Sequence, residues 1–301
     1  MKLLITGGSG LVGSAFNINA IKWSSKDVNL INFEKTLQAI TNLMPEYVIH
    51  TAGKVGGLLG NMNNKGQFFY ENIMINTNVL ESARLTNVKK VVSFLSTCVF
   101  PDNVKYPLTE DQIHNGEPHN SNYPYAYAKR MLDVQSRAYR EQYDCNYICV
   151  IPTNIYGPND NFNLKNGHVL PSLIHKCYLA KQNNEDFVIW GSGKPLREFI
   201  YSKDIAQLSL WALENYNEEE PIIFSTSEEI SIGDVAQIIA KYMNFKGNII
   251  FDKSKPDGQF RKPSLNKKLM KYIPEYKFTS IEDGLQETIE WFCQNYSNVR
   301  K

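Results

Sequence analysis

The first thirteen residues constrain the fold of this chain more than any other stretch. An apolar run at residues 2–6 predicts a short buried strand, and it leads directly into Gly-Gly-Ser-Gly-Leu-Val-Gly at residues 7–13. Gly7 permits a tight turn, Gly10 lets the backbone approach a pyrophosphate, and Gly13 lets the following helix pack close to the strand. Although a glycine-rich loop alone is often only a turn, its place after an apolar strand favours a dinucleotide-binding site, with helix N–H groups facing the anion.

Short apolar runs alternate with helical patterns over the first half of the chain, which is typical of a parallel sheet covered on both faces. We expect strands at residues 2–6, 21–25, 47–50, 88–96 and 147–152. Asn32 is expected to cap a helix that ends before Pro45. Longer helices are expected near 68–86 and 125–142, the first with an apolar stripe broken at Asn76. The predicted fold class is α/β, a Rossmann-type doubly wound parallel sheet.

The regular alternation is lost after Pro152, where Pro, Gly and Asn cluster. We therefore expect residues 1–155 to form the dinucleotide-binding Rossmann domain, with segments near 186–215 returning to it. Residues 156–301 are expected to form mainly a smaller α/β substrate-binding domain. One local feature is unusual, since only residues 14–20 separate Gly13 from the second strand, too few for the usual crossover helix. Either this helix is a stub with a tight return, or the second strand begins later than residue 21.

Tyr125 and Lys129 are four residues apart and share one face of the predicted helix. A free phenol has a pKa of about 10, and a neighbouring ammonium is expected to lower that of Tyr125 so that it can donate a proton near pH 7. Ser96 follows an apolar strand and would lie at the carboxyl edge of the sheet, where ligands bind. Each feature alone is more often structural, but the glycine loop, Ser96 and the Tyr-Lys pair in this order favour hydride-transfer chemistry.

This order of motifs resembles that of the extended short-chain dehydrogenases/reductases. Within that superfamily the chain is most similar to the GDP-L-fucose synthase family, whose members act on GDP-4-keto-6-deoxy-D-mannose as epimerase and reductase. The similarity runs nearly end to end. The most specific stretches are Lys-Val-Gly-Gly at residues 54–57 and Leu-Ser-Thr-Cys at 95–98, joined by Gly-His-Val-Leu-Pro at 167–171 and Arg-Glu-Phe-Ile at 197–200.

The resemblance implies two catalytic groups of residues. Ser96, Tyr125 and Lys129 would serve hydride transfer, while Cys98 and His168 would serve epimerisation. Inverting a carbon beside a ketone requires one group to remove the α-proton and another to return a proton from the opposite face. A thiol and an imidazole suit this task, with ordinary pKa values of about 8.5 and 6.5. From residue type alone, Cys98 also fits a buried small side chain and His168 a helix cap.

The cofactor is expected to be NADP(H). The second strand ends in Ser24-Ser25-Lys26, and two hydroxyls and an ammonium suit a 2′-phosphate. Asp27 could instead bind the ribose hydroxyls of NAD, but its position resembles that of an adenine-contacting Asp in the family. The expected cofactor-binding residues are Gly7, Gly10, Leu11, Val12, Gly13, Ser25, Lys26, Asp27, Ala52, Lys129 and His168.

A GDP-linked substrate carries a diphosphate, and Arg197 is the strongest candidate to bind it, because a guanidinium pairs with phosphate bidentately. Lys176 and Lys262 are further candidates, as is Arg261, although the last two could simply be solvated. Asn154 and Trp190 match positions near the substrate in the family, although a Trp before Gly is often only a strand-end anchor.

Composition excludes several other classes of protein. A net charge of +1 gives no general attraction to nucleic acid or anionic membranes, and no apolar run approaches the roughly 20 residues that span a bilayer. The five cysteines are odd in number and lack zinc-ligand spacing, so we expect no metal site and a reducing cytoplasmic location. The resemblance also implies a homodimer built from two helices of each subunit.

The predicted function is therefore NADPH-dependent 3,5-epimerisation and 4-reduction of GDP-4-keto-6-deoxy-D-mannose to GDP-L-fucose. Two alternatives remain open at this stage. The chain could reduce a related GDP-4-keto-deoxy sugar, such as the precursor of GDP-colitose, because the motifs would look almost the same. It could also be a non-catalytic NADP-binding sensor, although a sensor has no need of all five predicted catalytic side chains.

Overall fold

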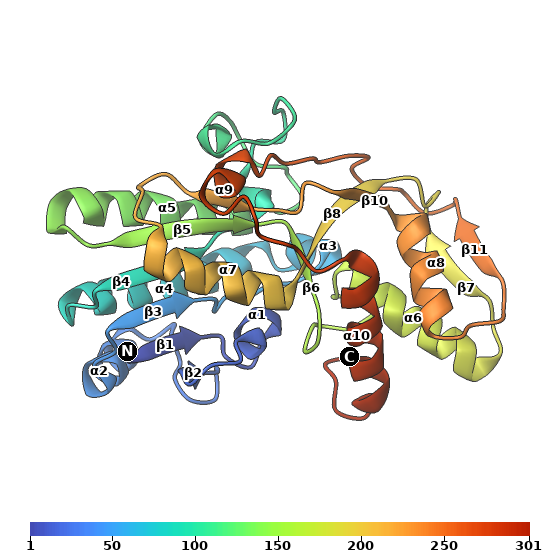
Figure 1. Cartoon of the computed structure of the whole chain (residues 1–301), viewed down its shortest axis with the longest axis horizontal. Coiled ribbons are helices and arrows are strands. Elements are labelled where there is room, and N and C mark those ends of the chain that lie inside the picture. The colour runs from blue at the N-terminus through green and yellow to red at the C-terminus, as the bar shows by residue number, and fades with distance from the viewer.

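A computed structural model describes the backbone of residues 1–301 and every side chain except those of Leu58 and Leu59. A six-stranded parallel sheet forms its centre, with strand order β2-β1-β3-β4-β5-β9 (Figure 1). The strands are β1 (Leu3–Thr6), β2 (Ile21–Trp23), β3 (Tyr47–His50), β4 (Lys90–Phe94), β5 (Tyr147–Pro152) and β9 (Ile222–Phe224). The order reverses between β1 and β3, and ligands bind at the carboxyl ends of strands at such a point. The predicted fold class is confirmed.

Helices cover both faces of this sheet because alternate strand residues point to opposite sides. Leu4, Val48 and Val91 pack with one group of helices: α2 (Phe33–Leu43), α4 (Lys65–Leu85) and α5 (Tyr123–Tyr143). Leu3 and Ile5 face the other side, toward α1 (Leu11–Ala15) and α7 (Ser202–Asn215). Continuous apolar runs such as Val-Ile in β3 thus follow from burial on both faces.

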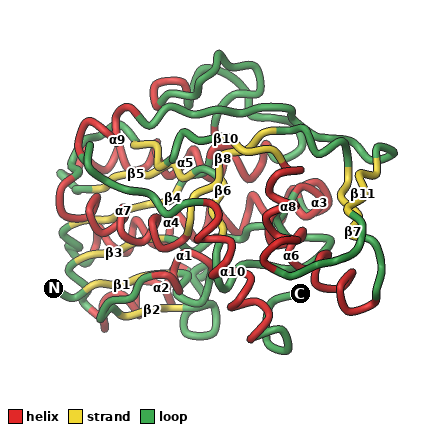
Figure 2. Tube along the Cα trace, turned by 45° about the vertical axis from the view of Figure 1, so that its right-hand side comes forward, coloured by secondary structure: helices red, strands yellow, loops and turns green.

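The remaining elements gather beside the carboxyl ends of the sheet. A three-stranded sheet has the order β10-β8-β6. Its strands are β6 (Asn154–Tyr156), β8 (Leu196–Tyr201) and β10 (Glu229–Ser231), and a two-stranded parallel sheet pairs β7 (Phe187–Trp190) with β11 (Ile249–Asp252). Figure 2 shows β7 and β11 at the opposite end of the molecule from β1 and β2. A separate apolar core joins α6 (Val169–Asn183), α8 (Ile232–Tyr242) and α10 (Ile281–Gln294).

Short elements complete the fold. They are α3 (Leu58–Asn63), α9 (Lys267–Tyr272) and two 3₁₀ turns, η1 (Thr97–Val99) and η2 (Glu110–Gln112). Within the predicted returning segment, α7 covers the central sheet, whereas β7 pairs with β11. The division of the chain near residue 155 stays a prediction. In the described part of the chain, no helix combines the length and apolar character needed to cross a membrane.

Several local predictions can be compared with the structure. Asn32 caps α2, since its side chain accepts a hydrogen bond from the N–H of Lys35 at 2.8 Å, and the helix ends at Leu43 before Pro45. The helix α1 is a stub of five residues, Leu11–Ala15, that contains Gly13, and β2 begins at Ile21, so the tight return is correct and the later strand start is wrong.

Other boundaries were placed wrongly. The strands predicted at 21–25 and 88–96 end earlier, at Trp23 and Phe94, and the latter begins at Lys90. The residues after Trp23 and Phe94 therefore lie in loops beyond the sheet. The two long helices begin at Lys65 and Tyr123, a few residues before the predicted starts.

Candidate active site

The glycine loop after β1 has the geometry of an anion cradle. Gly7 has φ +72°, and a Cβ there would lie 2.9 Å from the N of Ala52. A Cβ at Gly13 would lie 2.3 Å from the carbonyl oxygen of Gly7, so any side chain would fill the space between loop and helix. The N–H of Gly8 donates to the carbonyl of Trp23 at 2.7 Å and thereby ties the loop to the end of β2. The backbone present fits the pyrophosphate of a dinucleotide.

The turn after β2 adjoins this loop. The Oδ2 of Asp27 accepts hydrogen bonds from the N–H and hydroxyl of Ser24, both at 2.7 Å. These bonds lower the pKa of Asp27 and hold its carboxylate within the turn. The N–H of Lys26 donates to the Ser24 hydroxyl at 3.2 Å, which places Lys26 on a closed turn beside the glycine loop.

Tyr125 and Lys129 lie in the first two turns of α5, and both are buried. The Nζ of Lys129 lies 6.0 Å from the ring centroid of Tyr125 and donates to the carbonyl of Phe94, at the end of β4, at 2.9 Å. Ser96 follows two residues later and accepts a hydrogen bond from the N–H of Cys98 at 3.4 Å. The helix and the strand end thus bring Ser96, Tyr125 and Lys129 to the same edge of the sheet.

The pKa of Tyr125 does not follow the prediction. Burial raises it well above its ordinary value, and the neighbouring Cys98 raises it further. Burial also lowers the pKa of Lys129 to about 8. The predicted lowering of the Tyr125 pKa by Lys129 is therefore wrong for this structure, because removal of the phenol from water outweighs the attraction of the ammonium.

Cys98 joins the predicted epimerase function to this cluster. Its side chain is half-buried in η1. Burial raises the pKa of the thiol, while the Ser96 hydrogen bond and the charges of Lys262 and Lys129 oppose that rise. Tyr125, Lys129 and Lys262 are thus close enough to Cys98 to interact with its charge.

His168 is exposed at the N-cap position of α6. Among the described contacts its side chain makes no capping hydrogen bond, so the helix-cap reading does not account for the imidazole. The loop after β3 reaches this point, because the N–H of Gly57 donates to the carbonyl of Asn166 at 2.8 Å. At its other end, a Cβ at Gly53 would lie 3.5 Å from the Nζ of Lys129. The loop therefore spans the space between Lys129 and the start of α6.

Arg197 and Lys262 form a pair of desolvated cations. Burial lowers the pKa of both, and the charge of Arg197 lowers that of Lys262 further. Arg197 donates to its neighbour's carbonyl, that of Leu196, at 2.7 Å. Lys262 is half-buried and is thus not the solvated lysine that the sequence left open. Arg261 instead forms an exposed ion pair with Glu229 at 2.5 Å.

A hydrogen bond between Tyr106 and Gln259, near Arg197, was not predicted from the sequence. The Nε2 of Gln259 donates to the hydroxyl of Tyr106 at 2.6 Å, and the charge of Arg197 acts on the pKa of that phenol. The sequence separation of 153 positions explains why Tyr106 and Gln259 were not predicted together, because no local pattern connects them.

The remaining predicted substrate residues lie farther along the small sheets. Trp190 is 53% exposed, and the Nζ of Lys176 lies 4.4 Å from its ring centroid. Both line a cavity of about 260 Å³. Asn154, at the start of β6, donates to the carbonyl of Glu198 at 2.7 Å, so part of its amide holds β8 in place.

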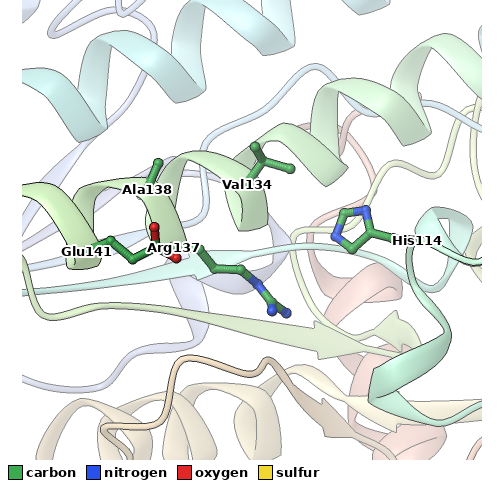
Figure 3. Close-up of a pocket in the computed structure, with 5 residues that line it drawn as sticks. All are labelled: His114, Val134, Arg137, Ala138 and Glu141. Atoms are coloured by element: carbon green, nitrogen blue, oxygen red, sulfur yellow. The ribbon is translucent and has the colours of Figure 1, made fainter.

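A second cavity, of about 340 Å³, lies away from these residues. Figure 3 shows it along α5, lined by His114, Val134, Arg137, Ala138 and Glu141. The Nε2 of His114 is 2.7 Å from Asp133, which also pairs with Arg137. Asp133 thus has partners in both His114 and Arg137, and none of the five lining residues was predicted to bind cofactor or substrate.

The fold and the site together define a dinucleotide-binding protein of the α/β class, and comparison with known proteins agrees. Residues 3–233 match the NAD dependent epimerase/dehydratase family, to which the chain belongs. Within it, the chain is 51% identical to the GDP-L-fucose synthase of Dictyostelium discoideum, over 99% of this chain and 97% of that protein. It is 33% identical to the GDP-L-colitose synthase of Yersinia pseudotuberculosis, over 99% of this chain and all of that protein.

A solved structure shows the same fold. The crystal structure of a GDP-L-fucose synthetase from Naegleria fowleri bound to NADP matches with a TM-score of 0.95 and 48% identity, covering 99% of this chain and 94% of that one. The resemblance seen in the sequence is thus confirmed. The roles of individual residues are taken up below as proposals.

Proposed function

We propose that this chain is an NADPH-dependent 3,5-epimerase and 4-reductase that converts GDP-4-keto-6-deoxy-D-mannose to GDP-L-fucose. The observation that carries the proposal is the position of the Cys98 thiol beside Tyr125 and Lys129 at the carboxyl edge of the sheet. A plain reductase needs the Tyr-Lys pair but has no need of an adjacent thiol. The similarity to proteins named GDP-L-fucose synthase supports the choice of substrate.

NADPH would supply the hydride for reduction at C4. The glycine loop would hold its pyrophosphate, Ser25 and Lys26 would bind the 2′-phosphate, and Asp27 would face the adenine. Ala52 lies against Gly7 and would border the cofactor, whereas Lys129 would bind the nicotinamide ribose. The preference for NADP is supported by the bound cofactor of the Naegleria fowleri structure.

Epimerisation would use Cys98 and His168. One removes the proton beside the C4 carbonyl, which gives an enolate, and the other returns a proton to the opposite face. Repetition at the second carbon inverts both C3 and C5. The two side chains come from different elements, η1 and α6, so they can approach a sugar ring from different sides.

Reduction would use Ser96 and Tyr125. Both donate hydrogen bonds to the C4 oxygen, and Tyr125 then gives its proton to that oxygen as the alcohol forms. The raised pKa of Tyr125 keeps the phenol protonated before the reaction. Lys129, held by the carbonyl of Phe94, provides a positive charge beside the ring.

Arg197 and Lys262 would bind the diphosphate. Two desolvated cations that repel each other are unfavourable unless an anion neutralises them. The GDP moiety would continue toward Trp190 and Lys176, where an exposed indole face can stack on a base. Asn154 would bind the sugar through the hydrogen-bonding groups of its amide that are not used by the carbonyl of Glu198.

We also propose a homodimer and a cytoplasmic location. Apolar residues stay exposed on both long helices, among them Tyr70 on α4 and Val134 on α5. An interface of two helices from each subunit would cover them. All five cysteines are free thiols, which suits a reducing compartment.

Incubation of the purified protein with NADPH and GDP-4-keto-6-deoxy-D-mannose tests this function, with the product identified by NMR. We expect stoichiometric NADPH oxidation and GDP-L-fucose. Because GDP-L-colitose synthase is among the relatives, a GDP-4-keto-3,6-dideoxy sugar is the competing substrate. A much higher kcat/KM on that sugar would show that it, and not GDP-4-keto-6-deoxy-D-mannose, is the substrate. Cofactor binding without turnover of either sugar would instead favour the sensor.

A further inference from the structure

One buried carboxylate near the candidate site has an oxygen without a partner. Asp160, in the loop between β6 and α6, is only 4% exposed. Its Oδ1 accepts a hydrogen bond from the N–H of Asn161 at 2.6 Å. Its Oδ2 has no hydrogen-bond partner among the described residues. A buried carboxylate oxygen left in this state is unfavourable, so a donor or cation is expected to serve it.

The loop folds back so that Asp160 comes near His168. Gly167 directly precedes His168, and Asn161 directly follows Asp160. A Cβ at Gly167 would lie only 2.5 Å from the carbonyl oxygen of Asn161, so the two ends of the loop are in contact. Burial raises the pKa of Asp160 to about 6, while the nearby charges of His168 and Arg300 act in the opposite direction. Most of the carboxylate is therefore ionised at pH 7.

Arg300 already has another partner. Its Nη2 donates to the backbone carbonyl of Asn159, and its side chain is exposed. His168 is likewise exposed but makes no capping bond among the described contacts. Arg300 retains further N–H groups, so donor capacity does not separate the two, but His168 is the one to which the proposed function assigns a proton transfer.

We propose that Asp160 is a positioning residue for His168. The carboxylate of Asp160 orients the imidazole of His168 and stabilises its protonated form during epimerisation. This proposal rests on the acid/base function proposed for His168. A carboxylate beside an imidazole favours the charged form, and an acid bonded to one ring nitrogen fixes which nitrogen faces the substrate. His168 exchanges its proton with the sugar carbon, and Asp160 itself gains none.

A double-mutant cycle on deuterium incorporation tests this proposal. The wild-type, Asp160→Asn, His168→Asn and the double variant are incubated with the keto-sugar in deuterated water without NADPH. We expect Asp160→Asn to slow exchange by at least about tenfold, since loss of general acid/base catalysis typically costs roughly 10² to 10⁴-fold and a misoriented imidazole loses part of it. The midpoint of its pH–rate profile should move to lower pH. In the His168→Asn background the same change should have almost no effect.

Controls separate positioning from folding. Asp160→Glu keeps the charge and should retain more exchange than Asp160→Asn. Asp133→Asn removes another buried carboxylate, on α5, and should leave the pH midpoint unchanged. Melting temperature and NADPH affinity report on the integrity of each variant.

The outcomes distinguish the two claims. If His168→Asn exchanged deuterium at the wild-type rate and still inverted C3 and C5, the acid/base assignment of His168 would be wrong. If His168→Asn were slow but Asp160→Asn were not, Asp160 would have no positioning function. Equal losses from Asp160→Asn in both backgrounds would likewise contradict the proposal, because they would show that Asp160 acts independently of His168.

Discussion

Tyr125 keeps its proton more firmly than a free phenol, although Lys129 lies in the next turn of α5. This state suits a proton donor, because the phenol must be protonated when the sugar arrives. When a hydride adds to the C4 carbon, the carbonyl oxygen becomes an alkoxide, which is a stronger base than a phenolate. Tyr125 can therefore give up its proton at that moment and retain it otherwise.

A substitution of Lys26 tests the cofactor assignment at the scale of a single residue. We predict that Lys26→Ala weakens NADPH binding several-fold and leaves NADH binding nearly unchanged. The reason is that one exposed charged contact to a phosphate contributes on the order of 1 kcal/mol or somewhat more. Calorimetric titration of both cofactors measures the effect. Equal weakening of NADPH and NADH would show that Lys26 does not read the 2′-phosphate.

Residues with a local signature could be predicted from the sequence, and those without one could not. Gly7, Tyr125 and Lys129 were placed because a turn and a helix spacing define them. Asp160 and the bridge from Tyr106 to Gln259 were missed because only the folded chain supplies their surroundings. The pKa of Tyr125 was predicted in the wrong direction because spacing reveals a neighbour but not the loss of water around it.

At the scale of elements, a buried histidine joins the sheet to the two long helices. The Nδ1 of His50, on β3, lies 2.8 Å from the hydroxyl of Thr6 on β1. Its Nε2 lies 3.1 Å from the Oδ1 of Asn76 on α4, whose Nδ2 donates to the carbonyl of Ala128 on α5. Asn76 thus interrupts an apolar stripe in order to hold the residue before Lys129.

This network predicts a pH dependence of stability. Burial lowers the pKa of His50 to about 3, with the charge of Lys129 adding to the effect. Between pH 6.5 and 3 the unfolded chain binds a proton at this residue that the native protein does not. The free energy of unfolding should therefore fall by up to about 1.4 kcal/mol per pH unit as pH decreases through that window.

His50→Gln removes the titrating group. The free energy of unfolding of this variant should therefore fall less steeply as pH decreases, with the contribution of roughly one proton missing from the slope. Urea unfolding of both proteins from pH 7 to pH 4 provides the comparison. Parallel slopes for wild-type and variant would mean that His50 is not held neutral by the fold.

The element pattern also shows what the sequence could not define. β9 was missed because three residues, Ile222–Phe224, are too short for any period to emerge, yet they extend the central sheet beside β5. The end of β4 was placed two residues too late because Leu95 is apolar but lies past the last strand residue. That error matters, since Ser96 needs to leave the sheet to reach a ligand.

At the scale of the whole molecule, the proposed dimer rests on the exposed faces of α4 and α5. We predict that Val134→Glu, which puts a charge on a residue 44% exposed in the single chain, shifts the protein toward monomer. Ile250→Glu on β11 is a matched control, because Ile250 is 42% exposed but lies away from these helices. Sedimentation velocity reports both. A wild-type monomer, or a Val134→Glu variant as dimeric as the control, would contradict the proposed interface.

The residues proposed for the two reactions come from different parts of the fold. The loop after β4 and the turn η1 supply Ser96 and Cys98, and α5 supplies Tyr125 and Lys129. His168 comes from the N-cap of α6 in the smaller region. The loop after β3 contacts both, beside Lys129 and at Asn166. The proposed roles therefore assign reduction and epimerisation to different residues, which substitution can separate.

Deuterium incorporation by Cys98→Ser tests this central claim most directly. In deuterated water without NADPH, the wild-type should incorporate deuterium at C3 and C5 of GDP-4-keto-6-deoxy-D-mannose, since enolate formation needs no reductant. Tyr125→Phe should retain this exchange while its NADPH oxidation falls by at least about a hundredfold. Cys98→Ser replaces the thiol with a far weaker acid, so its exchange should fall by roughly 10² to 10⁴-fold. Full exchange and normal product from Cys98→Ser would contradict the account and leave a C4 reductase with Cys98 as a packing residue.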